Sequence, residues 1–246
     1  MSYLRKIYGF GKKVIVPDLR YSQYIYEDVL NEKISGAENW LDLGCGHHLL
    51  PEWKFEEEKK LIDKAASVIG LDYDLPSLVK HRTIRTKVQG SATRLPFAEN
   101  IFDTVTANMV VEHLDNPQIQ FREVCRVLKP GGLFIFHTPN EFGHFSLMRK
   151  IVPRFAVKKL SKILDGRESD DVFEVHYKAN NRRAIENLAA ETGFETDKIK
   201  MVSTDAVFAV VPPLAVIELL WIKMLMADSL KHLRTNIIAV LRKKNR

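Results

Sequence analysis

The chain has 246 residues, of which 46% are hydrophobic and 28% are charged, and it contains two cysteines. This composition supports one substantial folded core and excludes global disorder, and two cysteines are too few for a disulfide-based fold. The start of the chain, "MSYLRKIYGFGKK", lacks the apolar run of a secretory signal, so we expect a reducing, cytoplasmic setting.

The net charge of +6 is concentrated at one end of the chain. Residues 223–246 contain seven lysines or arginines and one acid, so the charges of the remaining residues balance. Enzymes that bind nucleic acids usually carry a basic surface across their body, so we expect no nucleic-acid partner. A basic end beside an apolar segment points instead to an anionic membrane surface.

The first half of the chain predicts alternating helices and strands. A helix is expected in "DLRYSQYIYEDVLNEKI", followed by a buried strand in "NWLDLGC", a helix in "KFEEEKKLIDKAA" and a second buried strand in "SVIGLDYD". A short helix in "PSLVKHRTI" precedes a third strand in "KVQGSA", and "FDTVTANMVVEHL" predicts a fourth strand that runs into a loop. The amphipathic helix "PQIQFREVCRVL" stops at "KPGG", before a fifth strand in "LFIFHTPN". This alternation predicts an α/β fold with a doubly wound parallel sheet.

The second half is less regular. Residues 141–180 are mixed and basic, and "NRRAIENLAAETGF" predicts a helix that ends at Gly193. "DKIKMVST" and "NIIAVLRKK" predict two late strands, and residues 204–235 between them predict an apolar helical insertion.

The glycine loop "GCGHH" (Gly44–His48) allows several interpretations. A metal site is disfavoured because two adjacent histidines cannot both face one ion from regular structure, so we expect no metal. A redox role for Cys45 lacks a C-x-x-C partner, and a dinucleotide loop lacks its third glycine, since Leu49 stands there. A simple strand-to-helix turn remains the alternative to a ligand-binding loop.

The segments around this loop favour ligand binding. Asp72 ends the second strand, where a carboxylate can accept hydrogen bonds from ribose hydroxyls. "GSATRLPF" and "ANMVVEHL" follow the third and fourth strands, so all these segments meet at the edge where doubly wound sheets bind ligands. Gly44 and Gly46 let the backbone approach a ligand closely.

Four ordered motifs carry a family resemblance. "LDLGCG", "GLDYD", "GSATRLPFAENIFDTVTANMVVEHL" and "FREVCRVLKPGGLFIFHTPN" resemble the class I S-adenosylmethionine-dependent methyltransferases of the small-molecule, type 11 kind. The resemblance covers Asn39–Asn140 and implies a Rossmann-like, doubly wound, seven-stranded sheet with a helical cap. It implies S-adenosyl-L-methionine as the cofactor. It also implies an N-terminal helical segment over the cofactor site (1–36), a core (37–203 and 236–246) and a variable substrate-side insertion (141–180).

The resemblance assigns cofactor roles by position. The residues expected beside the methionine moiety are Asp42, Gly44, Cys45 and Gly46. Asp72 is expected at the ribose and Tyr73 on the adenine, whose edge is expected to face Ser91, Ala92 and Leu95. Asn108 and Met109 are expected at the methyl-donor end, with His113 in a lid over the cofactor.

This sequence departs from the family pattern at two places. His48 stands where a third small residue is usual, and the stretch from Gly46 to Asp72 is longer than expected. Ser91 replaces the acid that usually accepts a hydrogen bond from the adenine amine, so adenine recognition is expected to be weaker.

The function predicted from these motifs is methyl transfer to a small or lipid- or glycan-linked acceptor, with O-methylation preferred. Histidine is the usual base near neutral pH, and the candidates are His144, His176 and His113, whereas His137 fits a packing role. The alternatives are an RNA methyltransferase, an NAD-dependent oxidoreductase and a non-catalytic module that binds S-adenosylmethionine.

The apolar segment has four interpretations. It can pack on the protein's own core, cover an apolar substrate, form a homodimer face, or lie in a membrane interface through residues 207–235. In the last case Trp221 and Lys223 are expected to act as anchors, and the protein is expected at the inner face of the membrane.

Overall fold

The computed structural model describes residues 2–151 and 174–245, so part of the expected 141–180 insertion lies outside the described residues. The chain divides into two compact units. The sheet unit comprises Gln23–Thr138, Val175–Lys200 and Ile238–Arg246, and the helical unit comprises Met1–Ser22, Pro139–Glu174 and Met201–Ile237. The expected 1–36 segment is therefore divided, because its first helix belongs to the helical unit and most of its second helix to the sheet unit.

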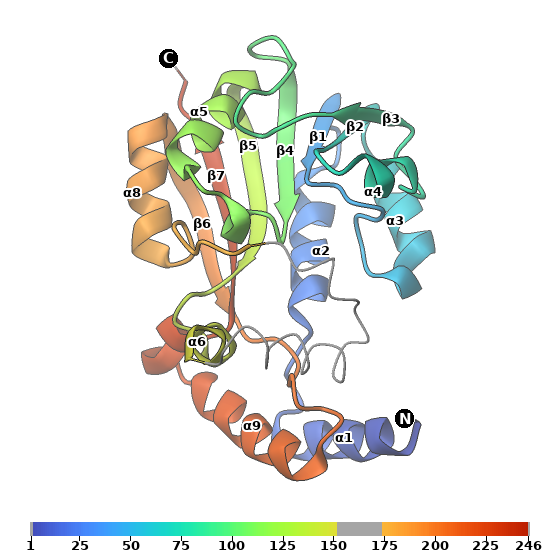
Figure 1. The fold of residues 1–246 in the computed structure, drawn as a ribbon, viewed down its shortest axis with the longest axis vertical. Coiled ribbons are helices and arrows are strands. Elements are labelled where there is room, and N and C mark those ends of the chain that lie inside the picture. Colours follow the sequence, from blue (N-terminus) through green and yellow to red (C-terminus); the bar gives the residue numbers. More distant parts are fainter. Residues whose placement is uncertain (1, 152–173, 246) are drawn as a thin grey trace. The chain divides into compact units, whose positions relative to one another are not determined.

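The seven strands form one sheet in the order β3-β2-β1-β4-β5-β7-β6 (Figure 1). The strands are β1 (Asn39–Leu43), β2 (Ser67–Asp72), β3 (Thr86–Gln89), β4 (Phe102–Asn108), β5 (Leu128–Pro139), β6 (Phe194–Val202) and β7 (Asn236–Lys243). β1 pairs in parallel with β2 and β4, β2 with β3, and β4 with β5. β7 runs antiparallel to β4 (Figure 1). The predicted seven-stranded α/β fold is confirmed, and the order of the strands reverses between β1 and β4.

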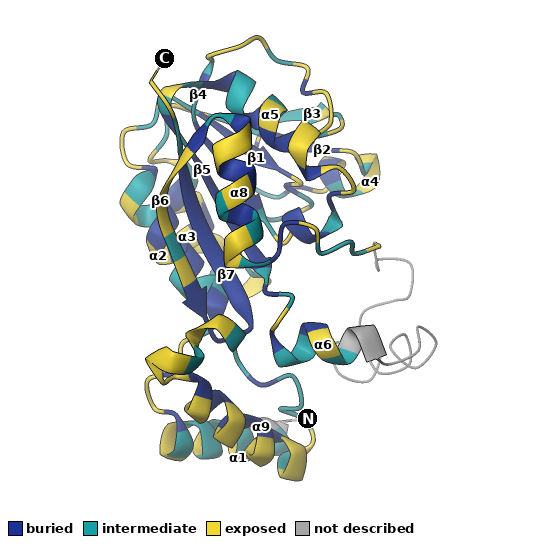
Figure 2. Cartoon of the chain, turned by 90° about the vertical axis from the view of Figure 1, so that its left-hand side faces the viewer, coloured by how far each residue is buried: buried dark blue, intermediate teal, exposed yellow. Residues whose placement is uncertain are grey.

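Helices cover both faces of this sheet. They are α2 (Ser22–Lys33), α3 (Phe55–Ile62), α4 (Leu75–Val79), α5 (Pro117–Val127) and α8 (Arg182–Thr192), with the short 3₁₀ turns η1 (Glu52–Lys54) and η2 (Val111–His113). α5 and α8 lie together on one face, and α2 and α3 lie on the other (Figures 1 and 2). Each predicted helix is present, although α3 and α4 end several residues earlier than the sequence suggested.

Aromatic side chains fill the core under α5. Phe121 of α5 meets Phe134 of β5 and Phe194 of β6 edge to face, with ring centroids 5.2 and 6.4 Å apart. All three rings are almost fully buried. Such edge-to-face contacts add to the energy of burial and fix β5, β6 and α5 against one another.

β5 is longer than predicted. It begins at Leu128 and includes "KPGG", which the sequence suggested as a helix stop before the strand. Leu128 pairs with Phe102, and a register shift follows before Leu133 pairs with Thr104. The glycines therefore form an irregularity inside the strand, which sequence periodicity does not detect.

The helical unit contains α1 (Ser2–Ile15), α6 (His144–Ile151), α9 (Pro212–Leu225) and the 3₁₀ helix η4 (Asp228–Leu233). α1 packs along α9 (Figure 2). The small core around this contact consists of Val16, Leu19, Ala206, Leu219 and Ile222, with Tyr8 and Ile15 packed against it. One side of the apolar insertion thus packs on the protein itself.

Buried Glu218 of α9 organises the chain that leads into this helix. Its carboxylate accepts hydrogen bonds from the backbone N–H groups of Val207 and Phe208, at 3.0 and 2.9 Å. His144 Nε2 lies 2.9 Å from Glu218 Oε1. The one acid of this apolar helix therefore has partners inside the unit.

Within the described residues, we find no helix with the length and apolarity needed to cross a membrane.

Gly193 ends α8 with a φ of +94°, and a Cβ there would lie 3.0 Å from Cys125 Sγ. Gly193→Ala should lower the free energy of unfolding by about 1–2 kcal/mol, because left-handed backbone is unfavourable for other residues. Urea denaturation followed by circular dichroism measures the change. Gly9→Ala in α1 is the control, since nothing lies within 4 Å of its added Cβ and alanine favours a helix interior. Equal losses in both variants would contradict the role of Gly193.

Candidate active site

The loop after β1 lies at the carboxyl edge of the sheet. Gly44 and Gly46 have φ values of +62° and +53°. A Cβ at Gly44 would lie 2.5 Å from Val110 Cγ2, whereas nothing lies within 4 Å of a Cβ at Gly46. The Gly44 N–H donates to Leu71 O at 2.7 Å, which holds the loop against β2. The loop therefore needs glycine for its conformation and exposes bare backbone at Gly46.

Asp72 joins this loop to the end of β2. Its Oδ2 accepts a hydrogen bond from the Gly46 N–H at 2.8 Å, and its Oδ1 accepts one from the Asp74 N–H at 2.9 Å. The residue is 8% exposed. A carboxylate can accept further hydrogen bonds beyond these two, so Asp72 keeps the capacity to bind hydroxyl groups at this edge.

Asp42 lies inside the sheet below the loop. Thr106 Oγ1 donates to Asp42 Oδ1 at 2.5 Å, and Trp40 Nε1 donates to Thr106 Oγ1 at 2.8 Å. Burial raises the pKa of Asp42 to about 7, and the charges of Glu58 and Asp72 add to this rise, although the Thr106 hydrogen bond opposes it. Asp42 is therefore a buried acid whose charge changes near neutral pH.

The end of β4 is held by His137 of β5. His137 Nδ1 lies 3.0 Å from Asn108 Oδ1, and Asn108 Nδ2 donates to Gln23 Oε1 at 3.0 Å. The His137 ring stacks on Tyr26 with centroids 5.6 Å apart. Burial lowers the pKa of His137 to about 3, so the ring is neutral at physiological pH. This placement agrees with the packing role expected from the sequence.

Met109 follows Asn108 with a φ of +58°, which is unusual for a residue other than glycine. Its N–H donates to His137 O at 2.8 Å, and the residue is 38% exposed. Strained backbone of this kind persists where surrounding contacts impose it and is common at functional sites. The contacts of β4 and β5 thus fix Met109 at the carboxyl edge.

The remaining cofactor residues expected from the sequence differ in exposure. Tyr73 is 60% exposed, and Leu95 is buried, with its N–H donating to Glu123 Oε2 at 2.8 Å. Ser91 is exposed and its hydroxyl lies 2.8 Å from that of Thr93. Ala92 is half-buried between these segments.

Cys45 does not have the features of a reactive thiol. Its side chain is buried in a cluster with Leu78 and Ile84, and burial raises the pKa of the thiol. A Cβ at Gly70 of β2 would lie 2.8 Å from Cys45 Sγ. The cysteine therefore packs the loop against β2, which supports the expectation that it has no redox role.

The three candidate histidines do not form one cluster. His176 donates its backbone N–H to Glu112 O at 2.8 Å, and His113 Nε2 lies 3.9 Å from Glu112 Oε1. Glu112 is buried, and its Oε2 accepts a hydrogen bond from Thr138 Oγ1 at 2.9 Å. His144 belongs to the helical unit, where Glu218 is its partner. Glu112 thus contacts the ring of His113 through its carboxylate and the backbone of His176 through its carbonyl oxygen, a link that the sequence did not reveal.

Comparisons with known proteins identify this arrangement. The family model for the methyltransferase domain matches residues 41–136. The uncharacterized protein MJ1252 of Methanocaldococcus jannaschii is 26% identical over 188 residues, 72% of this chain and 69% of that protein. The demethylmenaquinone methyltransferase of Renibacterium salmoninarum is 32% identical over 127 residues, and the match spans 50% of this chain and 52% of that enzyme. A crystal structure of S-adenosylmethionine-dependent methyltransferases from Methanosarcina mazei matches with a TM-score of 0.58 at 16% identity, covering 89% of this chain and 98% of that chain.

The chain matches the methyltransferase-domain model over residues 41–136, and it shares its fold with an S-adenosylmethionine-dependent methyltransferase of known structure. It spans about half the length of the demethylmenaquinone methyltransferase that it resembles. The cofactor of such a domain is S-adenosylmethionine, and every residue expected to bind it, from Asp42 to His113, lies within the matched range. His144 and His176 lie beyond it.

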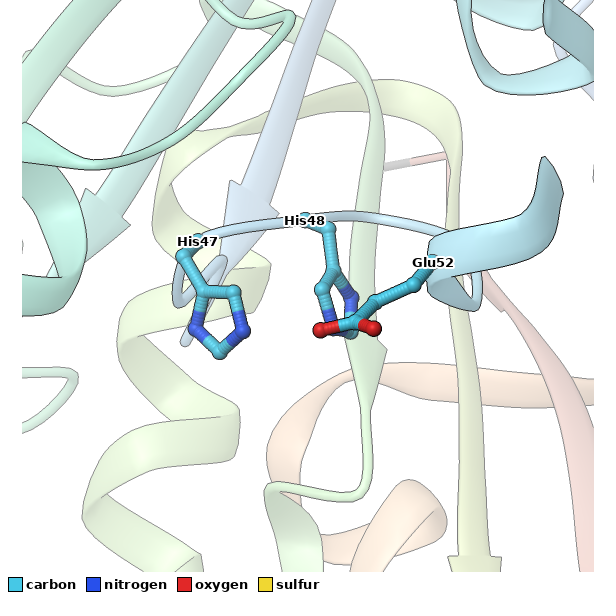
Figure 3. A group of neighbouring side chains, drawn as sticks. All are labelled: His47, His48 and Glu52. Atoms are coloured by element: carbon cyan, nitrogen blue, oxygen red, sulfur yellow. The ribbon is translucent and has the colours of Figure 1, made fainter. Parts of the chain in front are cut away.

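The methyltransferase domain contains one cluster that the sequence argument discounted. His47, His48 and Glu52 each direct one ligand atom into the same small region, and these atoms lie within 4.8 Å of one another (Figure 3). The two imidazole rings meet edge to face with centroids 4.3 Å apart. The adjacent histidines converge here because the residues after Gly46 form an irregular loop, whereas the sequence analysis considered regular structure.

The ligand atoms of this cluster are spaced more widely than those around a bound zinc ion. Zinc–ligand bonds of about 2.1 Å in a tetrahedral site place the ligand atoms about 3.4 Å apart. The ligand atoms of His47, His48 and Glu52 are up to 4.8 Å apart, so these side chains would have to move to bind one zinc ion. Arg82 donates to Glu52 O at 3.0 Å. Burial lowers the pKa of His48, and His47 and Arg82 add to this effect. His47, His48 and Glu52 offer the donor types for a divalent metal, but their ligand atoms would have to move closer together to share one ion.

A buried ion pair fixes the long segment between Gly46 and Asp72. Arg82 Nη2 lies 2.5 Å from Glu58 Oε2 and donates to Leu50 O at 3.0 Å. Glu58 is fully buried and accepts the Leu50 N–H at 2.9 Å. The additional length noted in the sequence is therefore an ordered loop held by Glu58 and Arg82. These residues are far apart in sequence and carry no motif, so sequence analysis missed them.

The raised pKa of Asp42 leads to a test on the ligand-free protein. Because the folded pKa of about 7 exceeds the ordinary value of 3.8, ionisation of Asp42 opposes folding. This cost is absent below pH 4, grows as the pH rises toward 7 and is complete above 7. Asp42→Asn should therefore gain stability relative to the wild type with rising pH, on the order of 4 kcal/mol at pH 8. Thermal unfolding from pH 4 to pH 8 measures this, and a difference that does not vary with pH would contradict it.

Proposed function

We propose that the protein transfers the methyl group of S-adenosylmethionine to a hydroxyl group of a small or lipid- or glycan-linked acceptor. The observation that carries the proposal is the Gly44–Gly46 loop, whose bare backbone is tied to the carboxylate of Asp72. This arrangement fits a nucleoside with a charged tail, because backbone and carboxylate lie together at the edge where doubly wound sheets bind ligands.

The residues of the sheet unit fit the cofactor. A side chain at Gly44 would disrupt the loop after β1, whereas the space beside Gly46 is open. Asp72 would hold the ribose, and Tyr73 would cover the adenine with its exposed ring. Asn108 and Met109 would line the end that carries the methyl group, where the unusual backbone of Met109 is held in place.

S-adenosylmethionine supplies a methyl group on a sulfonium, which is already activated for displacement. The protein's task is to align the acceptor oxygen with this methyl group, and such positioning can lower a barrier by roughly 7–11 kcal/mol. A hydroxyl acceptor also needs a base for its proton. We propose that a ring nitrogen of His176 or His144 accepts that proton, whereas His113 helps to close the cofactor site.

The contacts of these histidines support the assignment. Glu218 orients the His144 ring through Nε2, and the buried Nδ1 makes no hydrogen bond to any described residue, so an acceptor would have to enter the helical unit to reach it. A carboxylate that fixes one ring nitrogen leaves the other suited to proton transfer. His176 is held through its backbone beside Glu112, in the unit that contains the cofactor residues.

Two observations support an apolar acceptor that is not a nucleic acid. Relatives from several bacteria are named demethylmenaquinone methyltransferases, a name that supports an apolar, lipid-like acceptor. The balanced charge outside residues 223–246 supports a non-nucleic-acid acceptor. An RNA acceptor predicts binding that weakens steeply with salt, which filter binding at two salt concentrations would detect.

Asp72→Asn should weaken binding of S-adenosylmethionine by about 10- to 150-fold, because hydrogen bonds to a charged group contribute about 1.5–3 kcal/mol. Isothermal titration calorimetry with S-adenosylmethionine and S-adenosylhomocysteine measures the change. Asp74→Asn is the matched control, since Asp74 caps α4 through the Ser77 N–H and has no expected cofactor contact. Absence of binding of either ligand to the wild-type protein would refute the proposed function.

Replacement of the catalytic base should lower kcat by about 10²–10⁴-fold with little change in cofactor affinity. His176→Asn and His144→Asn test the two candidates separately, and His113→Asn should instead weaken cofactor binding. His232→Asn is the control because this residue is exposed on η4. A panel of hydroxylated lipid and glycan acceptors with radiolabelled cofactor provides the assay. Full activity of both base variants would exclude a histidine base.

A further inference from the structure

α9 is apolar on its exposed side as well as on its buried side. The buried residues are Ala215, Glu218, Leu219, Ile222 and Leu225. The opposite side presents large apolar side chains to solvent, namely Leu214, Val216, Ile217, Leu220, Trp221 and Met224. Ile217 is 64% exposed and Leu220 is 53% exposed. A helix that is hydrophobic all round is normally covered on every side.

α1 contributes a second apolar stripe. Ile7, Phe10 and Val14 are spaced by three and four residues, so they share one side of the helix. Phe10 is 72% exposed and Val14 is 63% exposed. Exposed Lys6 and Lys13 flank the stripe. α1 therefore has apolar side chains on two sides. One side packs against α9, and the other faces solvent.

α1 and α9 lie side by side in both views (Figures 1 and 2). Tyr8 and Ile15 of α1 pack on the core that contains Leu219 and Ile222 of α9. Lys12 forms an ion pair with Asp205, and the Tyr8 hydroxyl accepts the Ala206 N–H at 3.0 Å. These contacts join the helices into one body. We call their exposed apolar residues the α1–α9 surface, made of Ile7, Phe10, Val14, Leu214, Val216, Ile217, Leu220, Trp221 and Met224.

The charges around the α1–α9 surface favour an anionic partner. α1 contains no acid, and the single acid of α9, Glu218, is buried with partners of its own. Among the residues of the two helices whose exposure is described, the exposed charged ones are therefore cationic: Lys6, Lys13 and Lys223. Two copies of the surface placed face to face would bring these lysines together, which disfavours a dimer. Anionic lipid headgroups complement them, and Trp221 is a side chain that favours the membrane interface.

We propose that the α1–α9 surface docks the protein on an anionic membrane, with both helices lying in the plane of the interface. Such helices insert an apolar side into the boundary between headgroups and acyl chains, while lysines contact the headgroups. The docking does not depend on methyl transfer. It adds to the proposed function by supplying acceptors that are part of the membrane or linked to it.

Vesicle flotation of the full chain tests the proposal. We expect binding to vesicles of phosphatidylcholine with 30% phosphatidylglycerol, and binding at least tenfold weaker to phosphatidylcholine alone. Phe10→Ser combined with Ile217→Ser and Leu220→Ser should weaken vesicle binding at least tenfold. Lys6→Glu combined with Lys13→Glu and Lys223→Glu should abolish the preference for anionic lipid. The matched control is Val79→Ser with Ile119→Ser, which removes exposed apolar side chains from the sheet unit.

Three other results would contradict docking on an anionic membrane. Failure of the wild-type protein to bind either vesicle, or equal weakening by the control variant, would overturn the proposal. A dimer in analytical ultracentrifugation that the serine variant dissociates, without vesicle binding, would assign the surface to a second copy of the chain. Calorimetry with S-adenosylhomocysteine on all variants should give unchanged affinity. It therefore separates a failure of docking from a failure of the proposed methyl transfer or of folding.

Discussion

The hydrogen bond from the Gly46 N–H to the Asp72 carboxylate is the constraint on which the candidate active site depends. It joins the loop after β1 to the end of β2, two places separated by a helix and a long connection. It acts together with the bond from the Gly44 N–H to Leu71 O, and it places the Gly46 backbone directly beside the acid expected at the ribose. Because both groups lie at the carboxyl edge of adjacent parallel strands, the sheet itself keeps them in register.

Buried carboxylates hold the other irregular segments in the same way. Glu58 fixes the loop after the glycines through Leu50 and Arg82, and Glu112 links the turn after β4 to Thr138. Glu218 anchors the segment that precedes α9. A buried carboxylate needs hydrogen-bond donors to offset its lost hydration, and backbone N–H groups of irregular segments need acceptors. Each carboxylate therefore stabilises a piece of chain that helices and strands do not.

The two units have different physical characters. The sheet unit buries aromatic residues between sheet and helices and carries the residues expected to bind the cofactor. The helical unit buries only one side of α9, so it leaves more apolar surface in water than its own core requires. Exposed apolar surface of this extent is typical of sites that bind a partner or a membrane, which is the basis of the docking proposed for α1 and α9.

The sequence by itself determined the order of strands and helices, the glycine loop and Asp72, because periodicity and glycine placement are local properties. It also determined the methyltransferase domain, since four motifs occur in order. Only the tertiary structure decided that Glu112 joins His113 to His176, that His47 and His48 converge with Glu52, and that α9 leaves one side uncovered. These features depend on contacts between residues distant in sequence or on irregular backbone. No local pattern encodes either one, because burial and neighbouring charge are set only when the chain has folded.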